Sequence, residues 1–272
     1  MSSPLNLLVS IPYLHRWAIE QIQREPNIRL LLDSGAFTNF KAGKPYPLDD
    51  YCRFLDQLTI KPYRYFTLDV IGDHAASMRN YELLLKRGYK PIPIFTRGAP
   101  LEHLEHYYQT CDIVGLGALV GTRGNRGFVN GMMRLIGKRP VHWLGFTQLQ
   151  FLRRYQPAMC DASSFEAGAR YGQLRLYMGH GHFKSYSRQA LADAPPAVDF
   201  LQRIAHYGYD PYALRHERSW RGGESMVRLL CAASTVDFST DIERVLGVKL
   251  FVAWAANGFG KQLIDAYQRR PQ

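Results

Sequence analysis

The chain has 272 residues, of which 46% are hydrophobic, and a formal net charge of +11. This hydrophobic content supports a sizeable core and excludes a disordered chain. No apolar run is long enough to cross a bilayer, and no basic segment precedes the short apolar stretch near Met1, so we expect a cytoplasmic protein with no membrane partner. The positive charge favours a polyanionic partner, nucleic acid first, although many basic enzymes bind only small anions.

Short apolar runs alternate with amphipathic segments from the N-terminus onward. The predicted strands are Leu5–Ile11, Ile28–Asp33, Arg64–Val70, Lys90–Thr96, Asp112–Leu119, Val141–Phe146 and Ala158–Ala162. The predicted helices between them are His15–Arg24, Leu48–Thr59, His74–Arg87, Leu101–Gln109, Asn125–Ile136 and Gln148–Tyr155. Continuous apolar strands are typical of a parallel sheet that is buried on both faces. Because no Gly-x-Gly-x-x-Gly loop follows the first strand, we favour an α/β fold of the (β/α)8 TIM-like barrel type over a doubly wound sheet.

The C-terminal third, from about residue 172 to 272, is less regular. Met178–Ser187 is rich in Gly, His and Tyr and reads as a loop, and helices are predicted over Ala197–Tyr207 and Ser225–Ser234. The apolar segment Lys249–Ala256 fits either a strand or a closing helix. Since the chain shows no repeat and no low-complexity linker, we predict that residues 1–272 form a single barrel domain.

Three aspartates stand at the ends of predicted strands: Asp33, Asp69 and Asp161. Asp33 and Asp161 have an alternative role as helix caps, and Asp73 is the better cap for the helix at His74. In a barrel, all three strand ends would face one rim, where barrel enzymes place their chemistry. Two close carboxylates suit a double displacement at a sugar carbon, with one as nucleophile and one as acid and base.

A glycine-containing segment, Gly115 to Gly121, ends the fifth predicted strand, and glycines allow a ligand to approach the backbone closely. It lacks the Lys-Ser/Thr pair of a P-loop. The basic residues that follow, Arg123 and Arg126, are candidates for phosphate contacts or for solvated surface, and Arg218 and Arg221 are a second such pair.

No metal site is predicted from the residues themselves. The cysteines Cys52, Cys111, Cys160 and Cys231 are widely spaced, contain no Cys-x-x-Cys pair and are expected to be free thiols. His180 and His182 have no nearby cysteine or acidic pair to complete a ligand set.

The segment Asp33-Ser34-Gly35-Ala36-Phe37 resembles the Asp-Ser-Gly-Gly-aromatic motif of the tRNA-guanine transglycosylases. Val114 to Gly121 resembles their glycine-rich base-binding loop, and Asp69 and Asp161 lie where they keep a base-reading aspartate and the nucleophile. The resemblance covers the chain to about Tyr171. The short chain and the Asp161-Ala162-Ser163-Ser164-Phe165 segment are closer to the DNA-modifying branch of phages and bacteria, whose members insert 7-deazaguanine bases into DNA in the bacterial cytoplasm.

The resemblance implies a role for each of these residues. Asp161 would attack the sugar C1′ and expel guanine, and Asp33 would be the general acid and base. Ser34, Asp69, Gly117 and Ala118 would line the site and read the base, and Phe37 would stack on it. The target nucleotide would have to leave the base stack.

The chain departs from the family in two ways. Ala36 replaces the second glycine of the motif. The structural zinc of the tRNA enzymes is a cofactor that the resemblance suggests, but its Cys-x-Cys-x-x-Cys motif is absent here, which argues against tRNA as substrate. The partners expected are therefore DNA and a 7-deazaguanine base, with tRNA as the alternative, and a homodimer stands as an alternative to a monomer. A barrel that binds nucleic acid without catalysis and a barrel that acts on small phosphorylated metabolites are the other two interpretations.

Overall fold

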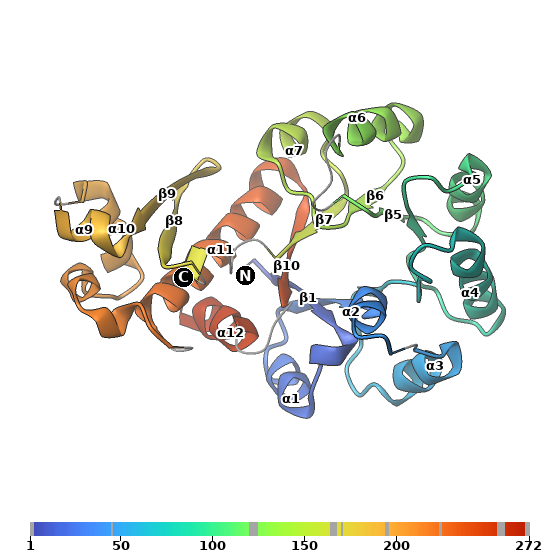
Figure 1. Ribbon diagram of the computed structural model, residues 1–272, viewed down its shortest axis with the longest axis horizontal. Coiled ribbons are helices and arrows are strands. Elements are labelled where there is room, and N and C mark those ends of the chain that lie inside the picture. The colour runs from blue at the N-terminus through green and yellow to red at the C-terminus, as the bar shows by residue number, and fades with distance from the viewer. Residues whose placement is uncertain are drawn as a thin grey trace.

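Eight parallel strands form one curled sheet in the larger lobe of the computed structural model (Figure 1). The structure describes residues 3–44, 46–119, 125–163, 168–169, 171–193, 196–222, 225–254 and 259–269. In spatial order, the strands of the sheet are β3 (Arg64–Tyr65), β2 (Ile28–Asp33), β1 (Leu5–Ser10), β10 (Lys249–Trp254), β7 (Met159–Ala162), β6 (Val141–Trp143), β5 (Val114–Leu116) and β4 (Ile94–Phe95). The last strand of the sequence thus lies in the middle of the sheet, between β1 and β7.

The two edges of the sheet meet at a single parallel bridge, Phe66 with Ile92. The amide of Thr67 donates to the carbonyl of Ile92 at 2.9 Å, and the amide of Ile92 donates to the carbonyl of Tyr65 at 2.8 Å. The contact therefore lies one residue after the end of β3 and two residues before the start of β4. The curled sheet is barrel-like, but no continuous ladder of hydrogen bonds joins these two edge strands.

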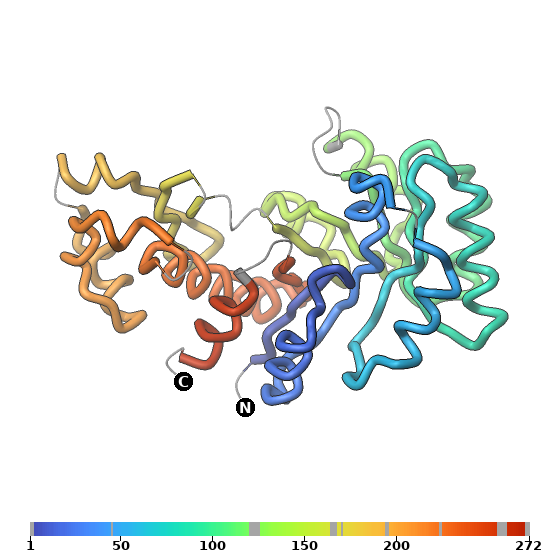
Figure 2. Tube along the Cα trace, turned by 60° about the horizontal axis from the view of Figure 1, so that its bottom comes forward, coloured from blue at the N-terminus to red at the C-terminus, as the bar shows by residue number. Residues whose placement is uncertain are grey.

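Helices follow the strands and cover the outer face of the sheet (Figures 1 and 2). They are α1 (Arg16–Arg24), α2 (Ala36–Lys41), α3 (Leu48–Gln57), α4 (His74–Lys86), α5 (Leu101–Thr110), α6 (Asn125–Ile136), α7 (Leu149–Tyr155) and α12 (Phe259–Arg269), and a 3-10 turn, Ile11–Tyr13, follows β1. Because neighbouring strand residues point to opposite faces, Leu7 and Val9 belong to the core under the helices, whereas Leu8 belongs to a separate cluster with Leu31 and Phe251. This second cluster fills the inside of the curl.

A smaller lobe is inserted between β7 and helix α11 (Met226–Leu246) (Figure 1). It contains the antiparallel hairpin β8 (Gln173–Gly179) and β9 (His182–Ser187), the helices α9 (Arg188–Asp193) and α10 (Val198–His206), and the 3-10 turns Pro211–Arg215 and Glu217–Ser219. Leu174 and Leu176 of the hairpin and Phe200 and Ile204 of α10 form a hydrophobic core of its own. The insertion therefore packs around an apolar centre distinct from that of the curled sheet.

Helix α11 joins the two lobes. Its N-terminal residues Val227 and Leu230 belong to the core of the insertion, whereas Val236 and Ile242 farther along belong to the core under the curled sheet. The side chain of Ser225 caps its first turn by accepting from the amide of Arg228 at 3.4 Å, and Gly247 ends it in the left-handed region with φ 71°. A single 21-residue helix thus fixes the distance between the lobes.

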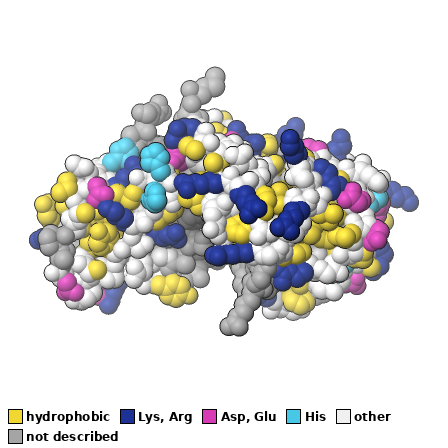
Figure 3. Space-filling model, turned by 90° about the horizontal axis from the view of Figure 1, so that it is seen from above, with side chains coloured by type: hydrophobic (Ala, Val, Ile, Leu, Met, Phe, Trp, Pro, Cys, Tyr) yellow, Lys and Arg dark blue, Asp and Glu magenta, His cyan; other side chains and the backbone are white. Residues whose placement is uncertain are grey.

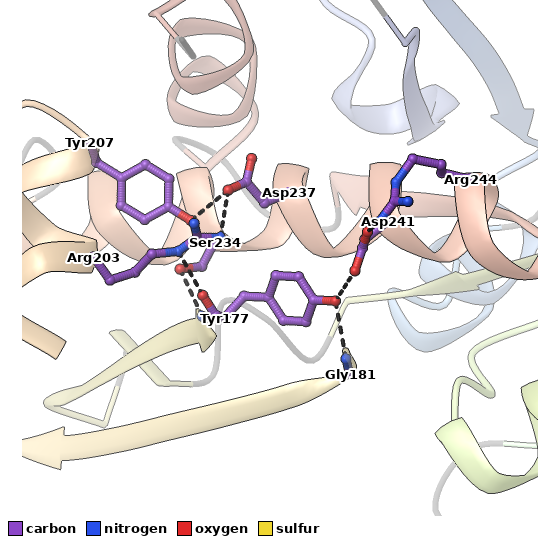
Figure 4. A network of polar contacts seen from close by, with 8 residues as sticks. All are labelled: Tyr177, Gly181, Arg203, Tyr207, Ser234, Asp237, Asp241 and Arg244. Carbon is purple, nitrogen blue, oxygen red and sulfur yellow. Dashed lines mark hydrogen bonds and ion pairs between the residues drawn. The ribbon is translucent and has the colours of Figure 1, made fainter. Parts of the chain in front are cut away.

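A polar network ties the hairpin and α10 to α11 (Figure 4). Arg203 donates to the carbonyl of Tyr177 at 2.8 Å and to Asp237 at 2.9 Å, and the Tyr207 hydroxyl donates to the same carboxylate at 2.8 Å. The amide of Tyr177 donates to Ser234 at 3.0 Å. The hydroxyl of Tyr177 donates to Asp241, which also pairs with Arg244, and accepts from the amide of Gly181 at 3.0 Å.

The structure confirms the expected α/β fold with a parallel sheet, and corrects two elements of the C-terminal third. Met178–Ser187 is not a loop, because most of it belongs to the β8–β9 hairpin, in which Arg175 pairs with Ser185 and Leu176 with Lys184. The apolar segment from Lys249 is a strand, β10. The predicted helix from Ser225 extends to Leu246, twelve residues beyond the predicted end at Ser234. In the described part of the chain, no helix combines the length and apolar composition needed to cross a bilayer.

Candidate active site

A cavity of about 660 Å³ opens at the carboxyl ends of the strands. Each of the eight strands contributes a lining residue from its own end or from the segment after it. The cavity brings together the residues predicted to catalyse the reaction or to bind the base, which are Asp33, Ser34, Phe37, Asp69, Gly117, Ala118 and Asp161. Its size is typical of cavities that enclose a small organic ligand.

Asp161 is a buried carboxylate held by two donors. Its Oδ1 lies 2.8 Å from Nε2 of His142, and its Oδ2 accepts from the amide of Gly145 at 3.2 Å. His142 stands on β6, next to β7, and is fully buried against the ring of Phe66 with 5.0 Å between the ring centroids. Since Nδ1 of His142 has no partner within the described residues, the tautomer with hydrogen on Nε2 suits the contact best. Asp161 therefore lies within β7 with its carboxylate oriented by an imidazole, and residues 164–167, where a helix capped by Asp161 would begin, are outside the described residues.

Asp33 ends β2 and lies close enough to Asp161 for their charges to interact. Burial is the main cause that raises its pKa, and the charge of Asp161 acts in the same direction. Hydrogen bonds from the Ser10 hydroxyl, at 2.5 Å, and from the Gly35 amide, at 3.2 Å, act in the opposite direction. Helix α2 has Gly35 as its N-cap, so Asp33 does not cap this helix. A raised pKa suits a group that must both give and take a proton near neutral pH.

Asp69 lies just beyond the bridge between the edges of the sheet, with Oδ1 buried and unpartnered within the described residues. Burial, and secondarily the charge of Asp33, raises its pKa to about 8. A buried carboxyl oxygen without a partner is costly unless a ligand supplies one. Asp73, by contrast, is the N-cap of α4, as the sequence predicted, and accepts from the amide of Ala76 at 2.8 Å.

Phe37 is the aromatic residue at the cavity wall. It is 56% exposed, and Nζ of Lys41 lies 4.4 Å from its ring centroid. An exposed aromatic ring beside a cavity offers a face on which a planar ligand can stack. Ser34, in the same turn, is buried and lines the cavity.

The glycine segment after β5 packs tightly and has an unusual backbone. A Cβ on Gly117 would stand 2.8 Å from Cγ2 of Ile94 and 3.0 Å from Cγ2 of Thr96, so no larger residue fits there without movement. Ala118 has φ 55°, a left-handed conformation that a non-glycine residue adopts only when its surroundings impose it. Gly117 and Ala118 both line the cavity, and the amide of Gly117 donates to the carbonyl of Phe95 at 2.9 Å. Val120 to Gly124, including Arg123, lie outside the described residues.

Of the four arginines predicted to contact nucleic acid, three lie among the described residues, and these three are not part of the cavity. Arg126 donates to Gln148 at 2.9 Å, Arg218 is exposed in the insertion, and Arg221 pairs with Glu217. None of these three lines the cavity. Their role as phosphate contacts stays a prediction.

Three functional groups were missed by the sequence reasoning: Ser10, His142 and Gly145. Ser10 could have been found as a hydroxyl at the end of an apolar strand. His142 could have been noticed as a histidine within the apolar run Val141–Phe146. Its partner, Asp161, could not be predicted without knowing which strands are neighbours. Gly145, with φ 69°, carried only the weak signal of a glycine after a strand.

Among the described residues, no group of three or more His, Cys, Asp or Glu side chains is arranged to hold a metal ion. The four cysteines are free thiols. No protein-family model matches this chain, and no curated protein sequence matches it.

Proposed function

We propose that this chain exchanges guanine in DNA for a 7-deazaguanine base through a covalent intermediate on Asp161. The observation that carries the proposal is the convergence of Asp161, Asp33 and Asp69 on one cavity at the carboxyl ends of the strands. With it we propose that the curled sheet is a (β/α)8 barrel, the architecture in which enzymes use this rim. The resemblance of the Asp33–Phe37 segment to the transglycosylase motif supports the same assignment.

The strand order supports a proposed position for each aspartate around the substrate. Counted around the curled sheet, β3 is the fourth strand from β7 in either direction. One direction passes through β10, and the other passes through β6 and crosses from β4 to β3 at the Phe66–Ile92 bridge. Asp161 and Asp69 therefore face one another across the cavity, and Asp33 on β2 stands between them. A nucleotide with its sugar at Asp161 would extend its base towards Asp69, with the glycosidic nitrogen near Asp33.

In the first displacement, a carboxylate oxygen of Asp161 bonds to C1′ while the bond from C1′ to the base nitrogen breaks. Asp33 donates its proton to the departing base and becomes a carboxylate. In the second, this carboxylate takes a proton from the incoming base, whose nitrogen bonds to C1′ as the aspartyl ester bond breaks. Two inversions at C1′ return the original configuration, as in retaining glycosidases.

The charge of the molecule supports a nucleic-acid substrate. The formal net charge is +11, and in Figure 3 Lys and Arg side chains gather across the middle of one face while most acidic side chains lie towards its two ends. Positive charge of this kind attracts a phosphate backbone regardless of sequence. Because the three aspartates lie inside a cavity, the target base must leave its stack to reach them.

A labelled-guanine exchange assay with separate DNA and tRNA pools tests the proposal. Label that enters DNA only, together with a denaturation-resistant protein–DNA adduct, is the expected result. Asp161→Asn keeps the shape of the side chain but removes the anionic nucleophile, so both label and adduct should disappear while DNA binding persists.

The alternatives have their own outcomes in the same assay. Label in tRNA only would keep the chemistry and change the substrate. Binding of nucleic acid with no exchange would favour the interpretation of a barrel that binds nucleic acid without catalysis. Neither binding nor exchange would favour a barrel acting on small phosphorylated metabolites.

A further inference from the structure

One side of the cavity carries basic side chains, an arginine and two histidines, that the exchange mechanism does not use. His74, Arg97 and His103 all line the cavity, together with Thr96. His74 is the first residue of α4, His103 lies in the first turn of α5, and Thr96 and Arg97 connect β4 to α5. We call these four residues the β4 compartment.

The β4 compartment is held in place by several contacts. Oγ1 of Thr96 lies 3.1 Å from Nδ1 of His74, which leaves Nε2 as the other polar atom of that ring. The guanidinium of Arg97 stands 4.8 Å from the ring centroid of Phe128, and the imidazole of His103 is 6.4 Å from the ring centroid of Tyr107. Tyr107 is buried, and the charge of Asp69 is among the causes that raise its pKa. The compartment is therefore next to Asp69, the carboxyl proposed to read the base.

The chemistry of the compartment is that of an oxyanion site. Two imidazoles, a guanidinium and a hydroxyl supply hydrogen-bond donors, and guanidinium and imidazolium bind carboxylates and phosphates through charge-assisted hydrogen bonds. The helices α4 and α5 also begin here, which adds partial positive charge. Among the described residues that line the cavity, the acidic ones are the three aspartates of the mechanism.

The orientation of the base decides which oxyanion can reach the compartment. This orientation rests on the proposed function, with Asp33 at the glycosidic nitrogen and Asp69 at the edge that carries N1–H and the 2-amino group. The 6-oxo group and position 7 then face the half of the rim between Asp69 and Asp161 that lacks Asp33, which is formed by β4, β5 and β6. The sugar and its phosphates lie across the cavity, at Asp161.

We propose that the β4 compartment binds a carboxylate carried at position 7 of the incoming 7-deazaguanine base. His74, Arg97 and His103 would select this anionic base over guanine and over bases whose substituent is neutral or cationic. A backbone phosphate shares the same chemistry but would have to enter from the far side of the cavity.

Calorimetric titration of the full chain with free bases tests this without requiring exchange. The probes are guanine and 7-deazaguanines that carry a carboxylate, a nitrile or an aminomethyl group. We expect the carboxylate base to bind at least about tenfold tighter than the aminomethyl base, because the guanidinium of Arg97 attracts a carboxylate and repels an ammonium group. Exchange assays with the same bases should give the same order.

Variants of the β4 compartment test whether its side chains cause the preference for the carboxylate base. Arg97→Gln and the double variant His74→Gln and His103→Gln should bring the ratio of carboxylate to aminomethyl affinity towards one. His106→Gln is the matched control, since His106 lies on the same helix α5 but pairs with Glu82 and does not line the cavity. It should keep the wild-type ratio.

Two results would overturn the inference: an aminomethyl base that binds as tightly as the carboxylate base, or a preference unchanged in the Arg97 and histidine variants. If the same variants instead raised only the KM for DNA, the compartment would hold a backbone phosphate and the inference would be wrong. Failure of the proposed function is distinct, because it shows as no exchange of labelled guanine in any nucleic acid, whatever the order of free-base affinities.

Discussion

Replacing His142 by phenylalanine should slow the exchange without unfolding the protein. Nε2 of His142 lies 2.8 Å from Asp161 Oδ1, and the imidazole is fully buried, so this is a hydrogen bond to a desolvated carboxylate. Its removal leaves the Gly145 amide as the remaining described donor. A hydrogen bond to a charged group contributes about 1.5–3 kcal/mol. If it acts by orienting the nucleophile, kcat should fall roughly 10- to 100-fold, because each 1.36 kcal/mol is a factor of about ten in rate.

Folding of the His142→Phe variant should be preserved for a physical reason. Phenylalanine keeps a ring against Phe66 and removes the buried Nδ1 that lacks a described partner. The melting temperature should therefore stay within a few degrees of wild type. Replacement by glutamine restores an N–H donor and should recover part of the rate.

Single-turnover formation of the protein–DNA adduct is the assay, because it isolates attack by Asp161 from product release. The KM for the free base should be little changed, since His142 is behind the nucleophile. A His142→Phe protein that forms the adduct at the wild-type rate would refute the idea that the imidazole positions Asp161.

Three further outcomes are expected at the same site and beside it. Asp33→Asn keeps the nucleophile but cannot transfer a proton, so exchange should slow by about 10²–10⁴-fold with the adduct still mapping to Asp161 by mass spectrometry; an adduct on Asp33 would reverse the two roles. Because the pKa of Asp69 is raised to about 8, the free protein holds a proton there at neutral pH, and binding an N–H edge of the base should release it. Base affinity measured by calorimetry should then rise with pH up to about 8 and level off, and Asp69→Asn should be weaker and independent of pH over this range; a flat wild-type profile would contradict the assignment. Neutralising Arg123 and Arg126 together should weaken DNA binding and reduce the slope of log affinity against log salt by about one for each phosphate that these side chains neutralise in the wild type; an unchanged slope would make this segment ordinary solvated surface.

The sequence was sufficient to predict the aspartates of the site. Asp33 and Asp161 interrupt short apolar runs, where a carboxylate is unexpected unless it has a function or a partner. Parallel strands bring their carboxyl ends to one edge, so these residues could be placed together from the order of strands along the chain. The glycine segment near Gly117 could be placed at the same edge, because it also follows the end of a predicted strand.

The support of the site was not predictable in the same way. His142 contacts Asp161 only because β6 pairs with β7, with His142 in register with Met159, two residues before Asp161. Strand pairing and register are set by the whole fold and leave no local pattern. The unpartnered Oδ1 of Asp69, judged among the described residues, is likewise a property of its surroundings.

The β8–β9 hairpin was wrongly predicted as a loop because the composition of its turn is not that of a strand. Gly179, His180 and Gly181 all have positive φ, and the register shifts between Tyr177 and Gly179. A chain rich in glycine and histidine at this point reads as a loop from composition alone. The buried Leu174 and Leu176 reveal a strand only once the core of the insertion is known.

The place of β10 in the sheet has a consequence for how the protein folds. β10 is hydrogen-bonded to β1 on one side and to β7 on the other. Without it, the part formed by β1 to β3, with Asp33, and the part formed by β4 to β7, with Asp161, would be hydrogen-bonded to one another in the described sheet only around the Phe66–Ile92 bridge. During synthesis the pairing that connects β1 to β7 has to wait for residues 249–254, and long-range pairing of this kind is slow and leaves strand edges exposed. We therefore expect that Asp33 and Asp161, the two carboxylates proposed to be catalytic, come together late in folding, when this strand pairs with its two neighbours.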